Sequence, residues 1–477
     1  MPGHKNKLQM KILVAIASYG TQQDHYLQKL LQSYRSMPFD VHIIVLSNLD
    51  KQLGPEIELK IGLPTNNPWS LPYGHKQLFA DRLNDYDLFI YSEDDMLISE
   101  RNLRAFVGSC ALLRDDEIPG FIRTEFDEQG NEYFCDAFDQ WHWEPHSVVE
   151  RSGQTYASFS NEHSACYMVT REQLKHCIAS GGFLIPPHED RHDLLCAAAT
   201  DPYIRCGPRR LINLSRFDDF LVPHLSNKYV GVCSLPSLDF RRQVCALLEI
   251  QKGSRPATQL FEMETMLPGI RWSKMYYEPA RDDELNLVPA GSTQVLSVGT
   301  GWGAAEQALR KRGIRVVALP IDSVISACAE ARGIEVVHGS FDEALRQLGQ
   351  QQFDCVLVSN ILHLVPEPAR VLTSLRRHLA PSANIIATVP NLMKPKVVWG
   401  RVRGDRQYAG ISDFATSHLH ITSHHRVQKW MHSAGYKIDR SVPVLSKRIP
   451  TWAAHLPLTS VKAALFASEW ITVAAKP

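Results

Sequence analysis

The sequence has no net charge, because its 51 lysines and arginines balance 51 aspartates and glutamates. Domains that bind nucleic acid or other polyanions carry clustered basic residues and an excess of positive charge. We therefore expect no nucleic-acid partner.

The sequence also lacks paired cysteines and long apolar runs. Its ten cysteines stand singly, with no CxxC pair, which is typical of proteins of a reducing compartment. The first apolar run, Ile12–Ala17, is too short for a signal peptide or a membrane span. These absences predict a soluble, cytoplasmic protein with no transmembrane segment.

Internal repeats and low-complexity tracts are missing too, so ordinary domains must account for the chain. A length of 477 residues exceeds what one core usually serves, and two domains are expected. We place them at residues 1–235 and 276–477, joined by a helical junction over 236–275. The tail Trp452–Trp470 has apolar residues near helical spacing, which fits core packing or a subunit contact; a homo-oligomer is left open.

The first half has the alternating pattern of an α/β fold with a parallel sheet. Lys11–Ser18, Val41–Ser47 and Asp87–Ser92 are apolar runs of strand length, separated by helical patterns over His25–Met37 and Gly74–Leu83. Ligands of such sheets bind at the carboxyl ends of the strands.

Three acids, Glu93, Asp94 and Asp95, follow the last of these strands directly. Neighbouring strand residues point to opposite faces, so three acids in a row fit only a strand end. Clustered carboxylates there suit a hard divalent cation, Mg²⁺ or Mn²⁺, that holds a diphosphate. The alternative is a solvated acidic turn.

The stretch Pro64–Ile98 resembles the donor half of a GT-A glycosyltransferase, the Rossmann-like fold of nucleotide-diphospho-sugar transferases. In that fold a DxD-type motif after the fourth strand holds the metal under a nucleotide-sugar donor. The resemblance implies that Glu93, Asp94 and Asp95 form this motif, with Asp95 and Glu93 as metal ligands. It further implies His224 as a late metal or diphosphate ligand, and Lys76 and Arg82 as donor-binding residues unless they are ordinary helix charges.

The same resemblance suggests an acceptor side that receives a glycan hydroxyl. His163 is expected to line it. In Pro187–Leu195, the pair Glu189–Asp190 precedes a predicted helix, and an inverting enzyme uses such a carboxylate to remove the acceptor proton. We predict Asp190 as that base, with Glu189 second. Helix-capping acids and a zinc site remain alternatives, although the order H-E-D-R-H is not HExxH.

The second half opens on the strand–turn–helix stretch Gln294–Ala305, QVLSVGTGWGAA. Gly299, Gly301 and Gly303 allow a sharp turn and a close approach to a ligand. Strands and helices then alternate in a doubly wound α/β pattern after a lead-in helix over Tyr276–Val288.

The stretch from Tyr276 to Ile438 resembles class I S-adenosylmethionine methyltransferases, and among them those that modify surface glycans. The resemblance implies S-adenosylmethionine as cofactor, bound by the three glycines, Asp322 and Asn360, and His418 as a substrate contact. At three positions where the family has an acid, this sequence has Ser297, Pro320 and Ser340. Losing two hydrogen bonds to a charged group costs roughly 3–6 kcal/mol.

Together these features predict a GT-A domain followed by a class I methyltransferase-like domain. The first would move a sugar from a nucleotide-sugar donor to a glycan acceptor during polysaccharide biosynthesis. The second would methylate the same glycan, or has kept only its fold. Two alternatives stand beside this: a methyltransferase alone, and a non-catalytic glycan-binding scaffold.

Overall fold

A computed structural model describes residues 10–446 and 465–477 of the chain. The chain divides into two compact units, Met1–Gln251 and Lys252–Pro477. The division falls within the expected junction over 236–275 and splits it. The helix α6 (Ser237–Gln251) belongs to the first unit, whereas Leu260, Met263 and Leu267 lie in the core of the second.

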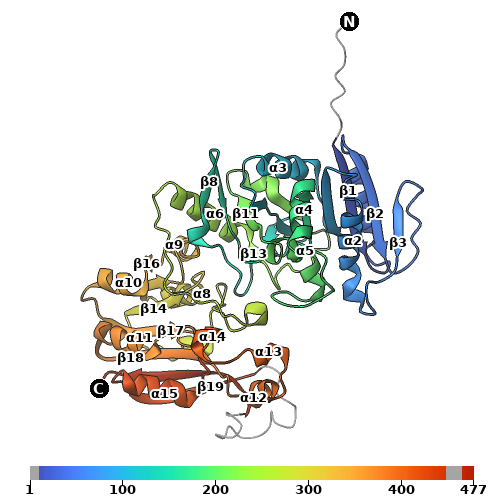
Figure 1. The fold of residues 1–477 in the computed structure, drawn as a ribbon. Helices are drawn as coiled ribbons and strands as arrows, with labels where there is room; N and C mark the ends of the chain where they lie inside the picture. The colour runs from blue at the N-terminus through green and yellow to red at the C-terminus, as the bar shows by residue number, and fades with distance from the viewer. Residues whose placement is uncertain (1–9, 447–464) are drawn as a thin grey trace. The chain divides into compact units, whose positions relative to one another are not determined.

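The central sheet of the first unit has five strands in the order β10-β4-β1-β2-β3 (Figure 1). All neighbours pair in parallel except β10, which is antiparallel to β4. The helices α1 (Asp24–Arg35), α2 (Gly74–Asp81), α3 (Glu100–Cys110), α4 (Arg171–Ala179) and α5 (Leu194–Ile204) follow in chain order. The strands are β1 (Lys11–Ser18), β2 (Asp40–Ser47), β3 (Glu58–Ile61), β4 (Leu88–Glu93) and β10 (Cys166–Thr170).

Two further four-stranded sheets complete this unit, in the orders β5-β11-β9-β8 and β12-β6-β7-β13. Their strands are only two to five residues long and carry polar residues, so no periodic pattern predicted them. Because β12 pairs in parallel with β6, the residues that follow β12 lie beside the end of β6. The strands are β5 (Glu117–Pro119), β6 (Ile122–Phe126), β7 (Glu132–Phe134), β8 (Val149–Arg151), β9 (Gln154–Ala157), β11 (Arg209–Asn213), β12 (Leu221–Pro223) and β13 (Leu235–Pro236).

The second unit is built on a seven-stranded sheet in the order β16-β15-β14-β17-β18-β20-β19 (Figure 1). The first five strands pair in parallel, and β20 runs antiparallel to both of its neighbours. The strands are β14 (Gln294–Thr300), β15 (Arg315–Pro320), β16 (Glu335–Val336), β17 (Phe353–Ser359), β18 (Leu379–Pro390), β19 (Lys437–Leu445) and β20 (Ala467–Ala475).

The tail Trp452–Trp470 lies outside the described residues up to residue 464. Its last residues enter strand β20, where Trp470 is buried in the core, as the core-packing alternative expects, and the β-branched Ile471, Thr472 and Val473 are buried between two strands. The expected lead-in helix is only the single turn α7 (Asp282–Leu285), because Pro279 offers no N–H donor and the backbone before it bonds elsewhere.

Eight further helices of the second unit lie between the strands of this sheet along the described chain. They are α8 (Ala304–Lys311), α9 (Ser326–Ala331), α10 (Phe341–Leu348), α11 (Pro368–Leu375), α12 (Pro395–Val402), α13 (Arg406–Ala409), α14 (Phe414–Ser417) and α15 (His424–Ser433). Among the described residues, no helix is both long enough and apolar enough to cross a membrane.

Candidate functional site

The three acids after β4 are largely withdrawn from solvent. Asp94 is 7% and Asp95 1% exposed, and Glu93 ends the strand itself. Burial and the neighbouring charge of Asp95 raise the pKa of Glu93 to about 7, and burial raises the pKa of Asp94 to about 6. The carboxylates of a solvated acidic turn would be exposed and would not have their pKa values raised by burial, so that alternative is wrong.

His224 lies between two buried carboxylates. Its Nε2 atom is 3.0 Å from Asp95 Oδ2, and its Nδ1 atom is 2.6 Å from Glu125 Oε1. Burial acts against protonation, but hydrogen bonds to Asp95, Cys135 and Glu125 raise the pKa of His224 to about 11. Glu125 ends no motif and was not predicted; it reaches His224 only because β6 and β12 pair.

Around His224, the possible metal-ligating atoms that lie together belong to Glu125, Cys135 and His224, whereas Glu93 and Asp95 offer free oxygens nearby. Asp95 Oδ1 and Glu93 Oε1 are buried and have no hydrogen-bond partner among the described residues. Unpaired buried oxygens are costly unless something binds them. A ligating histidine commonly donates its other N–H to a carboxylate, as His224 can to Glu125. A cation bound here would take the free oxygens of Asp95 and Glu93, and His224 would join them only as the neutral imidazole.

Two cavities are lined by residues near this cluster. One, of about 170 Å³, is lined by Glu93 and Asp94 and by Tyr19, Gln23, Leu195 and Lys228. The other, of about 290 Å³, is lined by Arg123, Trp141, His163, Asp193, Cys196 and Tyr229, among others. Leu195 and Lys228 line the first cavity, and the residues that follow them in the sequence, Cys196 and Tyr229, line the second. The ring of Tyr229 stacks on His224 at 5.5 Å.

Two residues predicted to bind the donor are used elsewhere. Lys76 is buried and forms an ion pair with the equally buried Asp201. Arg82 binds both carboxylate oxygens of Glu58, each at 2.8 Å. Both side chains satisfy a neighbouring acid and line neither cavity.

The acids of Pro187–Leu195 are also placed differently from expectation. Glu189 and Asp190 are exposed, and Asp190 pairs with Arg205 at 2.6 Å. Neither lines a cavity, whereas Asp193, the cap of α5, lines the larger one. His163 does line that cavity, is 7% exposed and has an unpartnered Nδ1.

The two histidines of this stretch do not share a metal. His188 Nε2 lies 3.0 Å from Asp201, and His192 Nε2 lies 3.3 Å from Glu162. They therefore contact different acids, and the zinc alternative is wrong. Instead, His192 stacks on Trp141 with ring centroids 5.3 Å apart and planes at 14°.

In the second unit, the three glycines of the turn after β14 approach the protein itself. A Cβ on Gly301 would lie 2.2 Å from the carbonyl oxygen of Tyr276, and one on Gly299 would lie 2.6 Å from Ile361. Gly303 has φ +90° and packs against Ala329. The three glycines also line a small cavity, and their role in binding a ligand stays a prediction.

The acid missing at Ser297 is supplied from the following helix. Glu306 is 5% exposed, and its Oε1 accepts hydrogen bonds from Ser297 Oγ (2.6 Å) and Thr300 Oγ1 (2.8 Å). The sequence comparison by position missed it because the residue lies nine positions later, on α8.

The other predicted cofactor residues make internal contacts. Asp322 accepts from the backbone N–H of Val324 (2.7 Å) and Ile325 (2.8 Å) at the start of α9. Asn360 donates to Glu278 Oε1 at 3.1 Å. His418, the predicted substrate contact, has φ +52° at the end of α14 and stacks on Phe414, away from the cavities described.

The space at the glycine turn is small. The cavity there measures about 40 Å³, and it is lined by Gly299, Gly301, Gly303, Glu306 and Asn360, among others. Cofactor pockets usually measure about 300–1,000 Å³. The volume of this cavity is well below that range.

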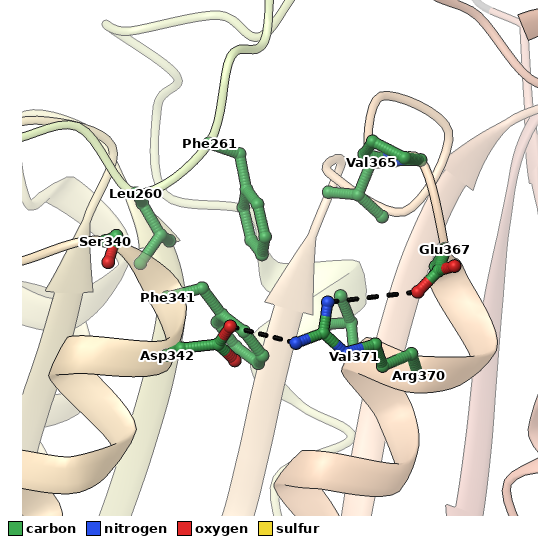
Figure 2. Close-up of a pocket in the computed structure, with 10 residues that line it drawn as sticks. Leu260, Phe261, Ser340, Phe341, Asp342, Val365, Glu367, Arg370 and Val371 are labelled. Atoms are coloured by element: carbon green, nitrogen blue, oxygen red, sulfur yellow. Dashed lines mark hydrogen bonds and ion pairs between the residues drawn. The ribbon is translucent and has the colours of Figure 1, made fainter.

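A larger cavity, of about 410 Å³, lies elsewhere on this unit. Figure 2 shows Phe261, Phe341 and Val365 around it, with Arg370 at the rim between Asp342 and Glu367. Arg370 is 2.9 Å from Asp342 and 3.8 Å from Glu367. None of the three glycines lines this cavity.

Comparison with known proteins concerns the second unit. Residues 281–468 match the family model "Methionine biosynthesis protein MetW", which covers less than half of the chain. No curated protein matches.

Similar solved structures include a putative methyltransferase of Haloferax volcanii in complex with the Trm112 activator (20% identity, 41% of this chain and 88% of that chain, TM-score 0.32). Another is a SAM-dependent methyltransferase from Archaeoglobus fulgidus (16%, 41% and 91%, TM-score 0.32). A third is magnesium protoporphyrin IX methyltransferase from Synechocystis with bound SAH (14%, 41% and 81%, TM-score 0.31). With the family match and the observed strand order, the second unit has a class I methyltransferase-like fold.

Proposed function

We propose that the first unit is a metal-dependent glycosyltransferase, which moves a sugar from a nucleotide-sugar donor to a hydroxyl of a glycan acceptor. The observation that carries this proposal is the Asp95–His224 pair, 3.0 Å apart, with Glu93 in the lining of one cavity and Tyr229, which stacks on His224, in the lining of another. A transferase needs two substrates to meet at one reactive centre, and two adjoining cavities supply that arrangement.

The smaller cavity suits the diphosphate of the donor. Mn²⁺ or Mg²⁺ held by Asp95, Glu93 and His224 would neutralise charge on the departing diphosphate. Lys228 lines the same cavity; burial acts against its charge, but Tyr229, Asp95 and Glu93 raise its pKa. A protonated Lys228 adds a second cation for the phosphates.

The larger cavity suits the acceptor sugar. Trp141 and the ring of His192 stack on each other beside it, and an aromatic face of this kind can pack against the apolar face of a sugar ring. His163 offers a neutral imidazole, because burial lowers its pKa well below the usual value. Asp193 is the carboxylate of this cavity, and it would take the acceptor proton if the reaction inverts.

The test is turnover of a panel of nucleotide-sugars by the full chain, measured as nucleoside diphosphate release. We expect release with at least one donor, loss in EDTA and recovery with Mn²⁺. Release that is indifferent to EDTA would contradict the metal, and no release from any donor, with or without glycan, would contradict the function.

A methyltransferase without glycosyl transfer is the second candidate, favoured by the family match over 281–468. It predicts methyl transfer from S-adenosylmethionine that survives every substitution at Asp95. A glycan-binding scaffold, the third candidate, predicts glycan binding without turnover of either donor.

A further inference from the structure

We propose that the second unit does not take up S-adenosylmethionine, because its own residues 258–278 occupy the place at the carboxyl ends of β14 and β15 where the cofactor of this fold would lie. The inference rests on the second unit alone. It is therefore independent of the glycosyl transfer proposed for the first.

The glycine turn is closed by residues Lys274–Glu278. The carbonyl oxygen of Tyr276 accepts from the Trp302 backbone N–H at 3.0 Å, and the carbonyl oxygen of Glu278 accepts from Trp302 Nε1 at 2.8 Å. The N–H groups of a glycine turn that opens a helix are the usual donors to a ligand. Here one of them is bonded to the chain itself, and a Cβ-free Gly301 is what lets the Tyr276 carbonyl approach.

Polar side chains fix the same segment in place. Lys274 forms an ion pair with Glu278 and donates to the carbonyl oxygen of Ser359 at 2.9 Å. Glu278 in turn accepts from Asn360. Tyr276 is 3% exposed, so its ring is part of the core and not a surface flap.

Residues 258–260 are hydrogen-bonded to the residues that follow β15 and to the start of α10. The Leu260 backbone N–H donates to the carbonyl oxygen of Ile321 at 2.8 Å, and the Leu260 carbonyl accepts from the Phe341 N–H at 3.2 Å. The Ser323 N–H also donates to the carbonyl oxygen of Thr258 at 3.0 Å. This backbone bridges the end of β15 and the start of α10.

Neither of these two cavities therefore suits the whole cofactor. The cavity of about 40 Å³ has the glycines but not the volume. The cavity of about 410 Å³ has the volume but none of the glycines. A ligand that spanned both would have to displace the Leu260 hydrogen bonds and the Tyr276 carbonyl together.

The first test is calorimetric titration of S-adenosylmethionine into the full chain, with a SAM-binding methyltransferase titrated in the same buffer as a control. We expect no saturable heat up to about 1 mM, which corresponds to more than a thousandfold weaker binding than a micromolar site. Micromolar binding would overturn the proposal, whether or not the segment moves aside.

The second test asks whether the segment is seated as described. Gly301→Ala places a Cβ against the Tyr276 carbonyl, and we expect it to lower the melting temperature of the second unit by roughly 3–10 °C. Gly291→Ala is the matched control, because no atom lies within 4 Å of a Cβ built there. An unchanged melting temperature for Gly301→Ala would sink the proposal even if no cofactor binds.

Discussion

The two units present the carboxyl ends of their parallel strands in opposite ways. At the end of β4, buried carboxylate oxygens of Glu93 and Asp95 have no partner among the described residues, and Glu93 lines a cavity. At the end of β14, the turn is bonded to Tyr276 and the acid Glu306 is satisfied by Ser297 and Thr300. Unsatisfied buried polar atoms point to a ligand, whereas a turn bonded to its own chain points to packing.

The largest expected effect concerns the acids at the carboxyl end of β4. Asp95→Asn removes a charge beside His224, and we expect it to lower sugar-nucleotide turnover by roughly a hundred- to a thousandfold. Asp85→Asn, an exposed acid before the same strand, is the matched control and should leave turnover unchanged. Equal turnover in both variants would indicate that these acids have only a structural role.

The next effect separates the acids of the acceptor side. Asp193→Asn should lower transfer to the acceptor by roughly a hundredfold if Asp193 is the base, because it lines the cavity. Asp190→Asn should change it less than about threefold, since Asp190 is exposed and paired with Arg205. The reverse order of effects would restore Asp190 as the base.

A smaller effect is expected at Glu125, which we regard as positioning His224. Glu125→Gln should weaken activation by Mn²⁺ by roughly 10- to 100-fold, as loss of a carboxylate behind a ligating histidine does. The maximal rate at saturating Mn²⁺ should change less than the Mn²⁺ concentration for half activation. The exposed Glu128→Gln serves as control, and a uniform loss of rate at all Mn²⁺ concentrations would argue against the positioning role.

The smallest effect concerns Glu306 beside the glycine turn at the end of β14. Glu306→Ala leaves the buried hydroxyl of Ser297 without its acceptor and removes one of the two acceptors of Thr300, and we expect the melting temperature of the second unit to fall by roughly 3–8 °C. Glu335→Ala, at an exposed ion pair with Arg315, should change it by no more than about 2 °C. A Glu306→Ala variant as stable as the parent would indicate that this carboxylate is held for a ligand.

The parts of the fold that the sequence predicted are those with a local pattern. The runs Lys11–Ser18 and Phe353–Ser359 form strands because nearly every residue is apolar and both faces of each sheet are covered. The acids at 93–95 were predicted as a strand end for the same local reason.

The parts that it could not predict depend on pairing between distant strands. Glu125 lies 99 residues from His224, within the short strand β6 of ordinary composition, so nothing near it signals a site. Lys76 and Arg82 have the residue types of phosphate ligands, and only the tertiary contacts with Asp201 and Glu58 show that they are engaged. Glu306 left a fainter signal, an acid in the first turn of the helix after the glycines.

The position of His224 has a consequence for how this protein would fold. Asp95 ends a strand of the central sheet, and Glu125 belongs to a different sheet, so the three side chains meet only after both sheets have formed. Contacts between residues so distant in the sequence form slowly, because long loops must close first. A cation that binds only the assembled cluster would stabilise the native state by mass action. Retention of the ion would then report on the integrity of the first unit, and it would be lost on the earliest partial unfolding that separates the two sheets.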